Sequence, residues 1–151
     1  MIRHLLAVAL AVTAAQPASA RTAEEVQALM VRAVDYIHQH GQQEAFAEFN
    51  RPGGQFVDGE LYVFCGTAAG IQLANGGNPK MVGKDLTGLR DAEGRVPNDD
   101  MYQLALTKGR GWYEYVWPNP AARKLQRKVA YVVRIDDQTF CASGYYKPDQ
   151  P

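Results

Sequence analysis

The hydrophobic period of the sequence changes from that of helices to that of strands at the breaker segment RPGG in residues 51–54. Before it, apolar residues recur every three or four positions behind Thr22, and Glu25 follows three residues after that threonine. This capping-box pattern predicts an amphipathic helix up to Gly41, which breaks or bends it. The stretch QQEAFAEFN in residues 42–50 predicts a second helical segment. Two consecutive helices are therefore expected to precede the rest of the fold.

After the breaker, the pattern is that of strands and turns. Helical spacing returns only in residues 98–109, after a stretch dense in Gly, Pro, Asn and Asp. Segregated helices and strands indicate an α+β domain built on an antiparallel sheet, with the long first helix on one sheet face and the inserted loops and short helix on the other. Five strands are expected, in GELYVFC, AAGIQLAN, GWYEYVW, KVAYVVRI and QTFCASGYY (residues 59–65, 68–75, 111–117, 128–135 and 138–146).

The first twenty residues show the three-part pattern of a secretory signal peptide. Arg3 gives a basic start, an apolar run follows in residues 5–15, and Ala18 and Ala20 form a small-residue cleavage signal. The apolar run is shorter than the roughly 20 residues that span a bilayer. We expect cleavage after Ala20, a mature domain over residues 21–151, and a periplasmic or secreted location. The chain ends at GYYKPDQP, so a protein that does not span the membrane is expected.

Charge gives no electrostatic case for binding to nucleic acid. Removing Arg3 from the 16 lysines and arginines leaves 15, against 16 aspartates and glutamates. A nucleic-acid-binding surface would need a broad positive excess. Four basic residues crowd together after the strand segment at residues 111–117: Arg123, Lys124, Arg127 and Lys128. We interpret them as a solvated basic turn, with an anion-facing role as the alternative.

Two cysteines, Cys65 and Cys141, remain in the predicted exported part of the chain. An even count in an oxidising compartment favours a disulfide between them. Two buried free thiols are the alternative. A catalytic thiol is a weaker hypothesis, because no histidine lies near either cysteine in the sequence.

The stretch GWYEYVWPNP at residues 111–120 concentrates aromatic side chains on one short strand. Buried Tyr and Trp need partners for their polar atoms, so a pure core would be built more simply from Leu, Ile and Val. A face that combines Tyr115, Trp117 and Tyr131 therefore suits the wall of a small-molecule pocket, with an ordinary aromatic core as the alternative. Pro118 and Pro120 lack amide donors and are expected to end the strand pairing there.

The ordered succession of several segments resembles the single Cache domain family, in its small standalone form. These segments are AFAEFN followed by Gly54 and Phe56, then GELYVF, NPKMVGKDLTGLRDAEGR, GWYEYVWPNP, KVAYVVR and CASGYY. The family consists of PAS-like extracytoplasmic ligand sensors, often for small organic acids. The resemblance implies a long N-terminal helix behind a five-stranded antiparallel sheet, with a ligand cavity on the other face. It also implies that the first and last strands are neighbours, which makes a bridge between Cys65 and Cys141 geometrically reasonable.

The resemblance also implies a set of ligand-binding residues. Lys128 is the first candidate for binding a carboxylate, with Arg110 and Arg123 in reserve. Strict alternation places Lys128 on the face opposite Tyr131, so we expect it to reach the pocket only from a strand end or a bulge. Asn75 stands where many relatives have a histidine, which suggests a different ligand. The expected cavity wall comprises Tyr62, Phe64, Trp112, Tyr115, Trp117, Lys128 and Tyr131.

The sequence therefore favours a secreted or periplasmic sensor protein that binds a small organic acid or a related metabolite and signals through a separate membrane receptor or kinase. No cofactor, metal ion or catalytic residue is expected. The alternatives are an interaction module with a filled core and, less favoured, a small enzyme. Four acidic residues could be read as a cation site, but their spacing is irregular and we interpret them as solvated turn residues: Asp91, Glu93, Asp99 and Asp100.

Overall fold

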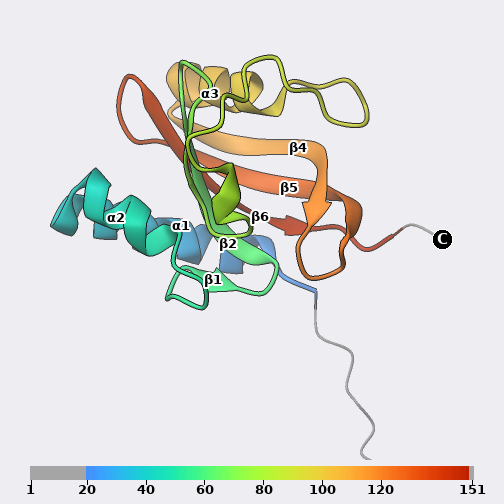
Figure 1. Ribbon diagram of the computed structural model, residues 1–151, viewed down its shortest axis with the longest axis horizontal. Helices are drawn as coiled ribbons and strands as arrows, with labels where there is room; N and C mark the ends of the chain where they lie inside the picture. Colours follow the sequence, from blue (N-terminus) through green and yellow to red (C-terminus); the bar gives the residue numbers. More distant parts are fainter. Residues whose placement is uncertain (1–19, 150–151) are drawn as a thin grey trace, which may run out of the picture.

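The computed structural model describes residues 20–149 of the chain, so the predicted signal peptide lies outside the described residues except for Ala20. Figure 1 shows two helices on one side of a sheet and a third helix with a long loop on the other. The elements, in chain order, are α1 (Ala23–His40), α2 (Gln42–Phe49), β1 (Val57–Asp58), β2 (Leu61–Thr67), β3 (Gln72–Asn75), the short 3₁₀ helix η1 (Pro79–Met81), α3 (Pro97–Lys108), β4 (Arg110–Asn119), β5 (Lys124–Arg134) and β6 (Thr139–Tyr146).

The predicted N-terminal cap of α1 is confirmed. The Glu25 amide donates to the Thr22 hydroxyl oxygen (3.2 Å), and the Thr22 amide donates to the Glu25 carboxylate (2.7 Å). Val26, Leu29 and Ala33 lie on the buried side of the helix. The helical spacing read from the sequence therefore marks the face that covers the sheet.

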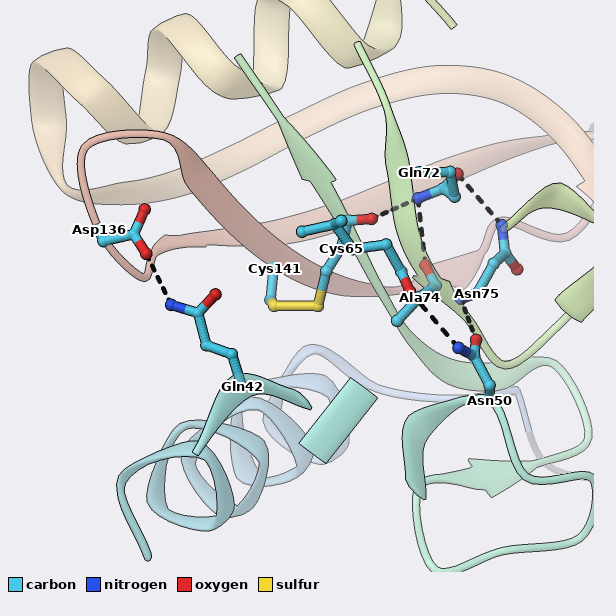
Figure 2. The surroundings of a disulfide bond; sticks show 9 residues. Gln42, Asn50, Cys65, Gln72, Ala74, Asn75, Asp136 and Cys141 are labelled. Atoms are coloured by element: carbon cyan, nitrogen blue, oxygen red, sulfur yellow. Dashed lines mark hydrogen bonds between the residues drawn. A yellow bond between two sulfur atoms is a disulfide. The ribbon is translucent and has the colours of Figure 1, made fainter. Parts of the chain in front are cut away.

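All strand pairs are antiparallel, and the order is β1-β2-β6-β5-β4, with β3 pairing with β2. The two-residue strand β1 was not predicted from the sequence. β2 and β6 are neighbours, as the resemblance implied, and Cys65 lies directly opposite Cys141 in their register. The two form a disulfide across 76 residues of chain, and Figure 2 shows it between the central strands. The predicted bridge is therefore present.

The sheet separates two cores. The α1 face holds Met30 and Ile37 against Val63, Cys65 and Cys141. The second core lies between the opposite face of the sheet and α3. Its buried residues are Tyr62, Phe64, Met101, Ala105, Tyr115, Ala130, Val132, Phe140, Ala142 and Tyr146. The predicted three-layer arrangement is confirmed, and the aromatic residues gather mainly on the α3 face.

The expectation that Pro118 ends the pairing of β4 is wrong, and the strand ends at Asn119, directly before Pro120. Pro118 pairs with Leu125, and Asn119 pairs with Lys124, so β4 and β5 each run further than the sequence indicated. β4 is an edge strand, where a residue without an amide donor costs no ladder hydrogen bond on its free side. The turn follows at Asn119, whose side-chain oxygen accepts from the amides of Ala121 and Ala122.

The loop between η1 and α3 is fastened to β4 by Asp91, whose side chain is fully buried. Its carboxylate accepts from the amides of Val116, Glu93 and Arg95, each at 2.9 Å, and from the Arg95 guanidinium. Burial alone would raise the pKa of Asp91, but these donors outweigh it and lower the pKa to about 2. Asp91 is therefore a structural anchor, and its interpretation as a solvated turn residue is wrong.

The disulfide gives a first prediction. Replacing both cysteines, as C65A/C141A, is expected to lower the free energy of unfolding by about 2–4 kcal/mol, because the unfolded chain loses a long-range constraint. Urea denaturation of the oxidised wild type and of the double variant measures the difference. An unchanged midpoint would show that the bridge does not stabilise the fold.

Asp91 gives a second prediction. D91N is expected to lower the free energy of unfolding by about 1–3 kcal/mol at neutral pH. The asparagine side chain has one acceptor oxygen where the carboxylate has two, so it cannot accept all of these hydrogen bonds. Since the folded pKa lies below the ordinary value of 3.8, the contribution is complete above about pH 4 and is lost as the pH falls toward 2. The gap between wild type and D91N should therefore narrow in acid. D35N, at an exposed position of α1, is the control, and an equal loss in both variants would contradict the anchor.

Candidate functional site

A small cavity lies on the α3 face of the sheet. The volume that the centre of a water molecule can occupy in it is about 20 Å³, which is room for roughly one water. A cavity therefore lies on the sheet face where one was expected, and it is narrow. All of its lining residues are uncharged: Tyr62, Phe64, Gln72, Asn75, Leu86, Leu89, Pro97, Asn98, Met101, Tyr115, Trp117 and Phe140.

A larger groove of about 600 Å³ adjoins this inner cavity. The two spaces share Tyr62, Asn75, Leu89 and Trp117, so the inner cavity forms the closed end of the groove. The groove runs between the end of β4 and the loop after β3, and its other lining residues are Gly77, Asn78, Met81, Arg90, Asp91, Ala92, Val116, Pro118, Pro120 and Leu125.

Amide side chains from β3 form one polar side of the inner cavity. The Gln72 amide nitrogen donates to the carbonyls of Cys65 (2.7 Å) and Ala74 (3.1 Å), which fixes its orientation against β2. The Asn75 backbone amide donates to the Asn50 side chain at 2.7 Å, as Figure 2 shows. The strand β3 is therefore held in place from both sides, and its amides present a fixed edge to the cavity.

Tyr115 provides a hydroxyl with no hydrogen-bond partner among the described residues. The residue is 2% exposed and lines the inner cavity. Burial raises the pKa of Tyr115 far above its usual range, with smaller effects from Tyr62 and Tyr113. The group therefore stays protonated and is free to donate a hydrogen bond to a ligand.

Lys128 is buried completely next to this cavity. Within residues 20–149, two side-chain polar atoms are completely shielded from solvent and have no hydrogen-bond partner: the Lys128 amino nitrogen and the Ser143 hydroxyl oxygen. The nitrogen lies 3.9 Å from the ring centroid of Tyr62, 4.8 Å from that of Phe64 and 5.1 Å from that of Tyr146. Burial lowers the pKa of Lys128 well below its ordinary range, and nearby Glu60 raises it only in part.

Lys128 reaches this side of the sheet by regular alternation, so the expectation that it needs a strand end or a bulge is wrong. Cross-strand partners in an antiparallel ladder point to the same face. Tyr115 pairs with Lys128, and Lys128 pairs with Tyr146. Lys128 does not itself line the cavity, and it lies against the rings of Tyr62 and Phe64, which do.

Two predicted wall residues, Trp112 and Tyr131, lie on the opposite face, so their placement in the pocket is wrong. They pair with each other across β4 and β5, their ring centroids are 4.9 Å apart, and Tyr145 packs beside them. Tyr131 contacts the α1 core and not the α3 core. The inner cavity therefore keeps Tyr62, Phe64, Tyr115 and Trp117 of the predicted set as lining residues.

The reserve cations do not reach the cavity. Arg110 lies at the start of β4 beside Tyr131 on the α1 side, and Arg123 is exposed in the turn between β4 and β5. Two further members of the basic cluster are paired at the surface. Lys124 forms an ion pair with Asp149, and Arg127 forms ion pairs with Glu93 and Glu114. The fourth member, Lys128, is buried away from this surface.

Sequence reasoning missed the wall that comes from the inserted segment. Leu86 and Leu89 close the cavity from the loop, and Pro97 and Met101 do so from α3. The apolar side of α3 was the only signal for this contribution. The helix α3 begins at Pro97 without a side-chain cap, and Asn98, the residue after it, is buried at the cavity.

Across residues 20–149, no group of three or more His, Cys, Asp or Glu side chains is placed to hold a metal ion. In the same part of the chain, no helix combines the length and the apolar character needed to cross a bilayer.

Comparison with known proteins identifies the family. The model described as Single Cache domain 2 matches residues 5–138, which is most of the chain. The chain belongs to the single Cache domain family. The PAS-like fold expected from the resemblance is thereby confirmed, and Cache domains are extracytoplasmic sensory domains that bind small ligands.

Solved structures of chemotaxis sensor domains share this Cache fold at low sequence identity. A methyl-accepting chemotaxis protein from Vibrio parahaemolyticus RIMD 2210633 has a TM-score of 0.66 at 20% identity, over 81% of this chain and 86% of that one. A periplasmic sensor domain of a chemotaxis protein has the same score and identity, over 83% and 90%. A Cache chemosensory domain described for carboxylic acid recognition has a TM-score of 0.65 at 22% identity, over 83% and 88%. At these identities the likeness shows the fold.

Gly77 allows a prediction about the cavity wall. A Cβ atom at Gly77 would lie 2.5 Å from two ring atoms of Tyr62, so G77A must displace a ring that is itself buried. We expect a loss of about 1–3 kcal/mol in the free energy of unfolding. Chemical denaturation measures it, with K80A in the same loop as the control. If G77A is as stable as K80A, the Tyr62 ring is not held as tightly as its burial indicates.

Proposed function

We propose that this Cache domain is a periplasmic or secreted binding protein for a small carboxylate, and that a separate membrane receptor or kinase reads its bound state. The observation that carries the proposal is the unpaired, fully buried amino group of Lys128 behind a cavity whose walls carry no charge. A buried amine without a partner costs stability, and a bound anion would supply the missing partner.

The polar groups around the cavity suit a carboxylate. The Tyr115 hydroxyl is a free donor, and the side-chain nitrogen of Asn98 makes only one long bond, 3.4 Å to the Thr67 carbonyl. A carboxylate has two oxygens and accepts several hydrogen bonds at once. One cationic donor and two neutral ones match that need.

The dimensions indicate a small ligand. The inner cavity has room for roughly one water molecule, so a carboxylate group can enter it only when the Tyr62 and Phe64 rings rotate away from Lys128. A short tail would lie in the adjoining groove, against Trp117 and Leu89. The likeness to a Cache domain described for carboxylic acid recognition supports this ligand class.

The narrowness of the inner cavity also favours a second candidate, an interaction module with a filled core. In that case Lys128 would be a neutral packing residue, and a protein partner would bind an outer surface. The two candidates differ in whether any small molecule stabilises the domain.

A thermal-shift screen of residues 21–151 tests the proposal. We expect acetate or propionate to raise the Tm selectively, whereas amino acids, purines and acetamide do not. A ligand at 100 times its Kd contributes about 2.7 kcal/mol, which is roughly 5–10 °C for a domain of this size.

Matched variants sharpen the screen. K128M and Y115F should remove most of the shift and keep a folded domain, while K124M, on the same strand at an exposed position, should keep it. If none of these ligands raises the Tm of the wild type, the carboxylate proposal fails and the filled-core candidate is favoured. An equal shift in wild type and K128M would place the ligand elsewhere.

A further inference from the structure

We infer that the site binds each carboxylate together with one proton, which Lys128 takes up. The inference rests on the proposed carboxylate site and adds a direction: affinity falls as the pH rises. It follows from three observations: the geometry around the Lys128 amino group, the uncharged cavity walls, and the lack of an anionic partner for Lys128 on the described elements around it.

The elements packed around Lys128 offer it no anion in the ligand-free protein. Tyr62 on β2, Tyr115 on β4 and Tyr146 on β6 are the titratable side chains that face it within the sheet. The nearest carboxylate that influences it is Glu60, which accepts a hydrogen bond from the Asn119 amide (2.9 Å) and forms no ion pair with Lys128.

The tyrosine hydroxyls stay protonated, so none of them serves as a counter-ion. Burial raises the pKa of Tyr62 to about 12 and raises those of Tyr115 and Tyr146 further. The Tyr146 hydroxyl donates to the Pro118 carbonyl (2.8 Å) and lies 3.1 Å from the Tyr62 hydroxyl. These two hydroxyls are therefore already committed to each other and to the backbone.

The ligand-free amine is consequently held in its neutral form. Removal from water disfavours the ammonium ion, and burial lowers the pKa of Lys128 well below its ordinary range. The faces of three aromatic rings attract an ammonium ion, but they cannot accept its hydrogen bonds as an anion does.

A carboxylate in the inner cavity reverses this preference, because no other charge is available there. All twelve lining residues are uncharged, so the bound anion can be balanced only by the ammonium form of Lys128. The balanced step is one carboxylate anion plus one proton plus the neutral amine giving the ammonium–carboxylate pair. The aromatic faces then contribute to holding the ammonium ion.

The sign of the pH dependence follows from linkage. In the pH range above the pKa of ligand-free Lys128 and below its raised pKa in the complex, binding takes up one proton. Affinity should therefore fall about tenfold for each unit of rising pH in that range. A lysine that was already charged before binding would give no such dependence.

Isothermal titration calorimetry of residues 21–151 with propionate tests this directly. Titrations at one pH in phosphate and in Tris separate the enthalpy of buffer ionisation from that of binding, and the difference gives the number of protons taken up. We expect uptake of up to one proton per propionate, and a Kd that rises with pH, by about tenfold per pH unit where one full proton is taken up. Acetamide, which carries no charge, should show no proton uptake if it binds at all.

Variants separate Lys128 from other sources of protons. K124M should take up the same number of protons as the wild type, and K128M should lose propionate binding. K128R replaces the amine with a guanidinium that does not deprotonate, so a folded K128R that binds propionate should do so without proton uptake.

The protonation state of Lys128 can also be measured in the ligand-free protein, independently of propionate binding. The ¹³Cε resonance of Lys128, assigned by its absence in K128M, should titrate well below the ordinary range of a lysine side chain. Propionate binding without proton uptake, or titration of Lys128 in the ordinary lysine range, would overturn the inference and leave the carboxylate site standing. If propionate does not bind at all, the proposed function itself fails, and this inference fails with it.

Discussion

The antiparallel register of β4, β5 and β6 places Tyr115, Lys128 and Tyr146 in one row across the sheet. Everything else at the site depends on this row. Because the three residues share a face, the long lysine side chain points into the layer beneath α3 and not toward solvent. Gly144 of β6 makes room for it, since a Cβ there would lie 2.9 Å from the Lys128 Cε atom. The Tyr62 and Phe64 rings of β2 then close over the amino group.

This arrangement is costly for a structural core and useful for a sensor. Lys128 brings a desolvated amine into a layer that aliphatic side chains would fill more favourably. The cost is tolerated because the scaffold is held elsewhere, by the Cys65–Cys141 bridge between the central strands and by the buried Asp91 carboxylate, which fastens the loop before α3 to the edge strand β4. The same loop that Asp91 fastens supplies Leu86 and Leu89 to the cavity, so the anchor and the site are parts of one structure.

Much of the fold could be predicted from the sequence because its signals are local. The cap at Thr22, the helical spacing of α1 and the short strands are each read within a few residues. The site was harder, because it depends on pairing between distant strands. Alternation showed which residues of β4 share a face, but only the register shows that Trp112 lies opposite Tyr131 and that both turn toward α1. The loop side of the cavity gave almost no signal, since Leu86, Leu89 and Asn98 reach it through tertiary packing.

The central claim is that the amino group of Lys128 is the anion partner of the ligand. The most direct test is a crystal structure of residues 21–151 grown with saturating propionate. The account predicts the carboxylate in the inner cavity, with one oxygen about 2.7–2.9 Å from the Lys128 nitrogen and the Tyr62 ring turned aside. Propionate bound only in the outer groove, with Lys128 still enclosed by its aromatic rings, would contradict it.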